Sequence, residues 1–180
     1  TIAAEQIPDA DMPTAHLLPE DAVAFLEPEP FIQSDDPRIM STAASVISPD
    51  AHPADNARAL VKWVYETIDK RPVMSVPDAV AVLVNRIGDC NEHAVLLAAL
   101  ARAAGIPAKI EAGLVYNDGR FYYHAWNLLY VGKWITADAT FGQLPADAAR
   151  IRLVSGSPGD QLDLLGVIDH IRMRIIETES

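Results

Sequence analysis

The sequence predicts an α+β fold, with helices in its first part and an antiparallel sheet after them. From about residue 36 to residue 104, apolar side chains recur at the spacing of helices, and beyond residue 108 they form short runs bounded by turn signals. The break at Gly105-Ile106-Pro107 separates the two patterns, because glycine suits the position after a helix and proline prevents its continuation. Helices grouped before strands are typical of the α+β class.

Three helices are predicted in the first part of the chain. The first covers residues 36–48 and begins at Asp35-Asp36-Pro37, where an aspartate can act as N-cap and the proline suits the first turn. The second covers residues 53–70, and the third runs from a capping-box sequence at Ser75 to about residue 86.

A fourth helix is predicted to begin near Cys90 and to be the most apolar of the set. Residues 94–104 (AVLLAALARAA) place apolar side chains around most of the helix circumference. We therefore expect a central helix that is buried on nearly all sides and packed on the sheet.

The sheet is predicted from the turn signals that follow. Strands at 108–116 and 120–131 are joined by a two-residue hairpin at Asp118-Gly119. Gly132 then turns the chain into a third strand at 133–138. Further strands are predicted at residues 150–154 and 167–176.

The first 33 residues carry five prolines and many acids, with little periodicity. We expect residues 1–33 to be an irregular lead-in: an extended arm, a linker or a segment packed around the domain. The domain itself is predicted over residues 34–180, which is about the size of a single domain.

Composition narrows the range of partners. The formal net charge is −11, from 25 acidic and 14 basic residues, and no cluster of Lys and Arg stands out, so we expect neither nucleic acid nor anionic membrane as a partner. No run of about 18 apolar residues could span a membrane, and no signal-peptide pattern opens the sequence. Because the sequence begins at Thr1, the expectation is a processed protein or a domain of a larger one.

Cys90 is the only cysteine, so it has no disulfide partner within the chain. A single cysteine taken alone is more often a buried apolar side chain. Its place at a helix start, after Gly88, favours a nucleophile, because the free amides and dipole of a helix N-terminus stabilise a thiolate. We therefore expect a thiol that reacts at pH values below about 8.5, the ordinary pKa of free cysteine.

His124 and Asp138 supply the other groups that a cysteine nucleophile needs. They lie eight residues before and six residues after Gly132, so antiparallel pairing brings them nearly opposite each other. The imidazole can accept the thiol proton and pass it to a leaving group, and a carboxylate can orient the imidazole. Each residue alone is more often structural, but with Cys90 they indicate a Cys-His-Asp catalytic triad.

His93 follows Cys90 by one helical turn, which could suggest a metal pair. A zinc site needs three or four protein ligands, and the sequence supplies no second cysteine or nearby cluster of histidines. We therefore expect no metal and no cofactor, and we interpret His93 as a buried hydrogen-bonding residue.

Two stretches resemble the transglutaminase-like superfamily, particularly its bacterial members. They are GDCNEHAVLLAALARAAGIPAKI (88–110) and FYYHAWNLLYVGKWITADATFGQ (121–143). The family pattern is G-x-C-x-E-H-A, G-I-P-A-R, H-A-W and D-P-T, and the resemblance covers about residues 75–155. It implies a papain-like α+β fold with Cys90, His124 and Asp138 as the Cys-His-Asp triad.

The resemblance implies a cysteine hydrolase, akin to a peptidase or amidase. Such an enzyme cleaves a peptide or isopeptide amide bond of a protein or peptide substrate through a thioester on Cys90. One alternative is a protein-glutamine amine acyltransferase with the same triad. Another is a catalytically weak peptide-binding module of a larger protein. Bacterial members include domains of larger cell-envelope proteins, so the envelope or periplasm is one setting that the resemblance allows.

The chain departs from the family pattern at three places. Asp138-Ala139-Thr140 stands where D-P-T is usual, Lys109 stands where arginine is common, and Leu128 occupies a position where an acid often falls. None of these changes removes a member of the triad. The side chain that completes the oxyanion hole in this family has no clear match in the sequence.

Overall fold

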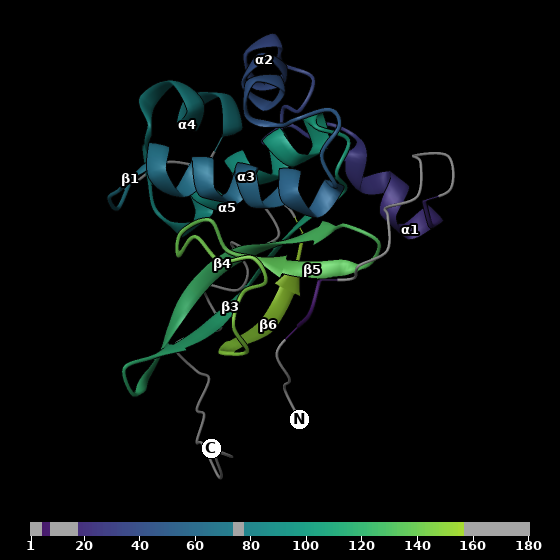
Figure 1. The fold of residues 1–180 in the computed structure, drawn as a ribbon. Coiled ribbons are helices and arrows are strands. Elements are labelled where there is room, and N and C mark those ends of the chain that lie inside the picture. Colours follow the sequence, from purple (N-terminus) through teal and green to yellow (C-terminus); the bar gives the residue numbers. More distant parts are fainter. Residues whose placement is uncertain (1–4, 8–17, 74–77, 157–180) are drawn as a thin grey trace.

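A computed structural model describes residues 5–7, 18–73 and 78–156, and it places a layer of helices on one face of an antiparallel sheet (Figure 1). The helices of this part of the chain are α1 (Glu20–Val23), the 3₁₀-helix η2 (Ala24–Leu26), α2 (Pro37–Val46), α3 (Pro53–Thr67), α4 (Ala79–Asn85) and α5 (Cys90–Ala103). The strands are β1 (Asp69–Lys70), β2 (Ile87–Gly88), β3 (Ala108–Asn117), β4 (Arg120–Tyr130), β5 (Trp134–Ala137) and β6 (Arg150–Ser155). The predicted α+β class is confirmed.

Helix starts are fixed by the residues that cap them. The Asp36 side chain accepts a hydrogen bond from the Arg38 amide at 2.9 Å, and Pro37 begins α2 as predicted. In α3 the cap is His52, whose Nδ1 accepts from the Ala54 amide at 3.2 Å. Helix α4 begins later than the sequence predicts, because Asp78 is its N-cap and accepts from the Ala81 amide. The predicted cap at Ser75 lies outside the described residues.

Helix α5 is the central element, as predicted. It packs against α2, α3 and α4 on one side and against β3 and β4 on the other. Eleven of its residues are buried, and its three leucines (Leu96, Leu97 and Leu100) have no exposed surface. Burying a leucine side chain stabilises a fold by about 1.5–3 kcal/mol, so this helix anchors the core.

The larger sheet has the strand order β5-β4-β3-β6, with neighbouring strands antiparallel. The β3–β4 hairpin turns at Asp118 and Gly119, whose φ angles of 47° and 81° match the two-residue turn that the sequence predicts. Strand β6 confirms the strand predicted at 150–154, whereas the strand predicted at 167–176 lies outside the described residues. Strands β1 and β2 form a short parallel pair beside the start of α5.

Residues 18–33 pack against the domain, which is one of the alternatives expected for the lead-in, but they include short helices in place of a wholly irregular structure. The segment holds α1 and η2, and Leu18 and Ala22 pack against Tyr130 of β4. Further along, Ile32 is only 1% exposed and joins the main core. The apolar residues between the prolines therefore fold this part of the lead-in onto the helices and sheet.

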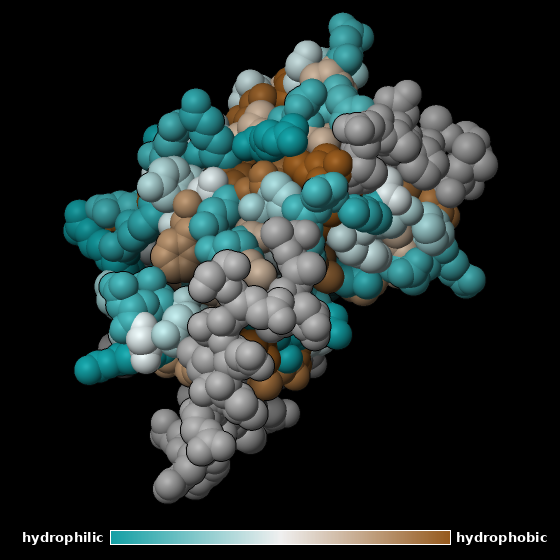
Figure 2. Space-filling model, turned by 60° about the horizontal axis from the view of Figure 1, so that its bottom comes forward, coloured by the Kyte–Doolittle hydropathy of each residue, from teal (hydrophilic) through white to brown (hydrophobic). Residues whose placement is uncertain are grey.

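The surface of the molecule is mostly hydrophilic on the face shown in Figure 2, and its hydrophobic residues come to the surface in separate patches. Among the described residues, no helix has both the length and the apolar character that a membrane span requires.

Candidate active site

Cys90 is the first residue of α5, and the residues on either side of it hold the helix start rigidly. The Asp89 side chain accepts from the Asn91 amide at 3.0 Å, and the Glu92 carboxylate accepts from the Asp89 amide at 3.0 Å. These bonds form a capping box, which satisfies amides that no helical carbonyl reaches. A Cβ at Gly88 would overlap the Glu92 side chain, so the chain can approach the helix this closely only with glycine there.

The Cys90 amide remains as a donor at this helix start. The hydrogen bonds of the described residues give it no acceptor, in contrast to the amides of Asp89 and Asn91. An N–H group at the first turn of a helix is suited to an oxyanion that forms next to the sulfur.

His124 and Asp138 form a buried pair on the sheet. The His124 Nε2 and Asp138 Oδ2 atoms are 2.6 Å apart, and the residues are 4% and 0% exposed. Because Nε2 faces the carboxylate, Nδ1 is the ring nitrogen that remains for another partner. The sequence analysis predicted this pairing of residues 14 positions apart, and the structure brings them together.

The register between β4 and β5 explains how the two side chains meet. Tyr130 pairs with Trp134 and Asn127 with Ala137, so the same register continued by one residue sets Trp126 opposite Asp138. His124 is therefore a diagonal neighbour of Asp138 on the same face, in keeping with the nearly opposite placement that the sequence predicts. Long side chains reach each other across such a diagonal.

Asp138 accepts hydrogen bonds from three directions besides His124. Its Oδ1 accepts from the backbone amides of Thr140 and Phe141, at 3.0 and 3.1 Å. Its Oδ2 accepts from Nε and Nη2 of Arg150, at 3.1 and 2.5 Å. Burial by itself raises the pKa of Asp138, but the hydrogen bond and charge of His124, with the charge of Arg150, lower that pKa below its ordinary value.

The Cys90 sulfur lies beside β4, at the residue that follows His124 in the strand. The Ala125 backbone amide is near enough to stabilise a thiolate, and the charge of Asp138 also acts on the sulfur. The next residue of α5, Asn91, accepts a 2.9 Å hydrogen bond from the Tyr123 hydroxyl and so ties the helix start to the strand. The structure therefore places Cys90 next to residues 123–125 of β4.

The Cys90 thiol differs from the expectation in one respect. Burial raises the pKa of Cys90 to about 12, and the negative charge of Asp89 acts in the same direction. The Ala125 amide acts in the opposite direction but does not outweigh burial. The structure therefore does not support the lowered thiol pKa expected from the helix start, because burial of Cys90 favours the neutral thiol.

Aromatic rings enclose the histidine. The Phe141 ring lies 5.0 Å from the His124 ring and the Trp126 ring 6.3 Å from it, centroid to centroid. Trp126 is buried, whereas Phe141 is 45% exposed and forms part of the surface beside the pair. Rings in these positions limit the access of water and fix the plane of the imidazole.

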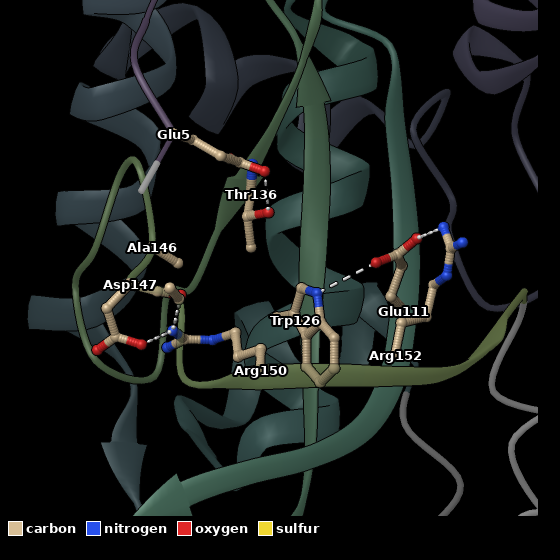
Figure 3. A pocket seen from close by; sticks show the side chains of 9 residues that line it. Glu5, Glu111, Trp126, Thr136, Ala146, Asp147, Arg150 and Arg152 are labelled. Carbon is tan, nitrogen blue, oxygen red and sulfur yellow. Dashed lines mark hydrogen bonds and ion pairs between the residues drawn. The ribbon is translucent and has the colours of Figure 1, made fainter. Parts of the chain in front are cut away.

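A pocket of about 120 Å³ lies next to the His124–Asp138 pair and is lined by Trp126 and Arg150, among others (Figure 3). Its walls hold both charged and apolar side chains, and several of them are hydrogen-bonded to one another: Trp126 Nε1 donates to Glu111 at 3.2 Å, and Glu5 accepts from Thr136. The indole N–H of Trp126 already has Glu111 as its acceptor, and that of Trp134 has Asp21. Neither tryptophan therefore serves as the oxyanion donor in this structure.

His93 is fully buried, as the sequence analysis predicted for a hydrogen-bonding residue. Its Nδ1 lies 2.6 Å from the Asp89 carbonyl oxygen, so the proton sits on Nδ1, and burial lowers the pKa of the ring. Across residues 5–7, 18–73 and 78–156, no three His, Cys, Asp or Glu side chains gather as metal ligands.

A known protein family matches the part of the chain that holds these residues. The sequence profile described as the transglutaminase-like superfamily matches residues 40–139, which include Cys90, His124 and Asp138. The chain belongs to the transglutaminase-like superfamily. No curated protein sequence matches it significantly.

Solved structures from several bacteria have a fold similar to that of this chain. A candidate cysteine protease from Cytophaga hutchinsonii is 26% identical with a TM-score of 0.72, and the match covers 85% of this chain and 52% of the other. The periplasmic domain of TgpA from Pseudomonas aeruginosa is 23% identical with a TM-score of 0.54, covering 71% and 49%. A candidate protease from Parabacteroides distasonis is 18% identical with a TM-score of 0.50, covering 61% and 24%.

The matched region spans about half or less of each of these structures. The last two, below 25% identity, establish the fold only.

Sequence reasoning missed Arg150 as a part of the site. It predicted a strand over 150–154 but gave no reason to single out its first arginine. The signal was indirect: a carboxylate as deeply buried as Asp138 needs a charged partner besides a histidine. Only the pairing of β6 with β3 brings Arg150 to that carboxylate.

Proposed function

We propose that this chain is a thiol hydrolase that cleaves a peptide or isopeptide amide bond through a thioester on Cys90. The observation that carries the proposal is the buried 2.6 Å contact between His124 and Asp138 beside the start of α5. Membership of the superfamily and the likeness to a candidate cysteine protease support the same chemistry.

In the first half of the reaction, the Cys90 sulfur attacks the substrate carbonyl carbon. His124 Nδ1 takes the thiol proton as the S–C bond forms, because the thiol is neutral at rest. The Cys90 amide donates to the oxyanion, and Asp138 stabilises the imidazolium. When the C–N bond breaks, His124 returns the proton to the departing amine, and the thioester remains.

In the second half, water attacks the thioester carbon. His124 takes a proton from the water, the C–S bond breaks, and the proton returns to the sulfur, which releases a free acid. A primary amine in place of water would give a new amide by the same steps. The two outcomes differ only in the acceptor, and the triad serves both.

The test uses a denatured bacterial proteome as a mixture of protein substrates, with and without an added primary amine. Wild-type protein should create new peptide ends that Cys90→Ala does not, and mass spectrometry identifies them. Amide exchange at modest amine concentration would establish acyl transfer instead. If neither product forms and the wild-type chain only retains peptides, the chain is a binding module and the hydrolase proposal is wrong.

A further inference from the structure

We propose that Arg150 is a positioning residue for the triad: its guanidinium fixes Oδ2 of Asp138 and keeps that carboxylate ionised beside His124. This inference rests on the proposed function and extends it to a residue on β6, outside the region that the family profile covers. Arg150 touches neither the sulfur nor, in the proposed mechanism, the substrate.

The geometry at Asp138 carries the inference. Arg150 places both Nε and Nη2 on Oδ2, the same oxygen that faces His124 Nε2 at 2.6 Å. Its side chain is 4% exposed, and the Asp138 side chain is fully buried. An ion pair with several hydrogen bonds in such surroundings is held in one geometry, because breaking it leaves an unpaired buried charge.

The far end of the guanidinium is held as well. Nη1 donates to Asp147 Oδ1 at 2.6 Å and to its backbone carbonyl, and Nη2 donates to Gln143 Oε1 at 2.8 Å. Figure 3 shows Arg150 directed toward Asp147, on one side of Trp126. Contacts at both ends therefore fix Arg150, which in turn fixes the carboxylate that orients the imidazole.

The charged groups around Asp138 determine how removal of Arg150 would change the protonation of the His124–Asp138 pair. The groups that face Asp138 or its partner are His124 from β4, Cys90 and His93 from α5, and Asp147 from the loop before β6. Among the described residues, Asp138 forms ion pairs with His124 and with Arg150. Without Arg150, the His124–Asp138 pair retains a proton to higher pH, and a protonated pair cannot accept the thiol proton.

Arg152 offers a matched control. It lies on the same strand, two residues further on, and lines the same pocket, but it bonds to Glu111 and its side chain is 61% exposed. A substitution of Arg152 removes one positive charge from the same surface without touching Asp138.

The experiment measures acylation of Cys90 by p-nitrophenyl acetate across pH, with the acetylation of Cys90→Ala subtracted, because the chain has one cysteine but the reagent also acetylates amines. In Arg150→Gln the acylation rate should fall by about 10- to 100-fold. Losses of this size follow when a residue that holds a metal ligand by a hydrogen bond is substituted. The acid limb of the pH–rate profile should move to higher pH. Arg150→Lys, which restores the charge without the fork, should recover the position of the limb but not the full rate.

The outcomes separate this inference from the function on which it rests. If His124→Gln leaves the acylation rate unchanged, the proposed function fails. If His124→Gln slows acylation while Arg150→Gln matches Arg152→Gln in rate and acid limb, only the role of Arg150 is overturned. Should Arg150→Gln not fold, as judged by circular dichroism, Arg150→Lys carries the test, and a rate equal to wild type overturns the positioning role.

Discussion

At the scale of single residues, the site combines a neutral thiol with an imidazole that is held by an ionised carboxylate. Burial raises the pKa of Cys90 and does not prevent Asp138 from remaining charged, because His124 and Arg150 lower the pKa of Asp138, whereas the Ala125 amide does not offset the burial of Cys90. Proton transfer from Cys90 to His124 therefore accompanies attack on the substrate instead of preceding it.

This difference predicts the pH dependence of alkylation. With a pKa of about 12, Cys90 is protonated at neutral pH, so native protein should react with iodoacetamide more slowly than protein unfolded in urea at pH 8. The native rate should continue to rise with pH above 9. A native rate that levels off below pH 8 would instead mean a preformed thiolate, against this account.

Substitution of Asp138 tests the orienting carboxylate. Asp138→Asn should lower turnover by a factor on the order of 10²–10⁴, as for orienting carboxylates in other triads, because the amide favours the wrong imidazole tautomer. The Michaelis constant should change little, since Asp138 is buried beneath His124. Steady-state kinetics measures both constants. Near-normal turnover would remove Asp138 from the triad.

At the scale of secondary-structure elements, the start of α5 sets the position of the nucleophile. The capping box and the close contact of Gly88 with Glu92 fix the helix end at Cys90. Because the side chain of Asn91 also bonds to Tyr123, small shifts of this end would move the sulfur relative to β4.

Gly88→Ala tests this dependence. A Cβ would lie 2.2 Å from the Glu92 Cβ, so the helix end must shift, and overpacking of this kind costs about 1–3 kcal/mol of unfolding free energy. Urea denaturation measures that loss. The comparison variant is Gly119→Ala in the β3–β4 turn, which has open space around it, so that its cost comes from the strain of a positive φ and not from overpacking. If Gly88→Ala retained both wild-type stability and the wild-type acylation rate, the close contact of Gly88 with Glu92 would not be what positions Cys90.

Much of the arrangement of elements follows from local sequence signals. The apolar residues of α5, the Asp36 cap and the Asp118-Gly119 turn are local features, and the structure confirms each of them. The diagonal offset of His124 and Asp138 follows from the turn at Gly132, because His124 lies eight residues before it and Asp138 six residues after it. The contact of Arg150 with Asp138 depends on how β6 pairs with β3, which no local pattern specifies.

At the scale of the whole molecule, the helices and sheet cooperate to bury groups that titrate. Glu92 of α5 is 3% exposed, and burial raises its pKa to about 7; the nearby Asp89 side chain acts in the same direction, and the hydrogen bond from the Asp89 backbone amide acts against it. The folded chain therefore binds a proton that the unfolded chain has released between pH 4.5 and 7. By linkage, stability falls as pH rises through this interval.

Glu92→Gln should remove this contribution. The glutamine can still accept the hydrogen bond from the Asp89 amide, but it does not titrate. Melting temperature measured from pH 4.5 to 7 should fall less steeply in the variant than in the wild type. The control is Glu66→Gln, whose side chain is 59% exposed. Parallel curves for wild type and Glu92→Gln would contradict the raised pKa.

The central claim is that Cys90 is a nucleophile that His124 activates. The most direct measurement is the rate at which p-nitrophenyl acetate acylates Cys90 at neutral pH, followed by intact mass in the wild type and in His124→Gln. The wild-type rate should exceed that of the variant by a factor on the order of 10²–10⁴, the usual contribution of a positioned general base. Equal rates, or no adduct on Cys90 in the folded wild-type protein, would contradict the claim.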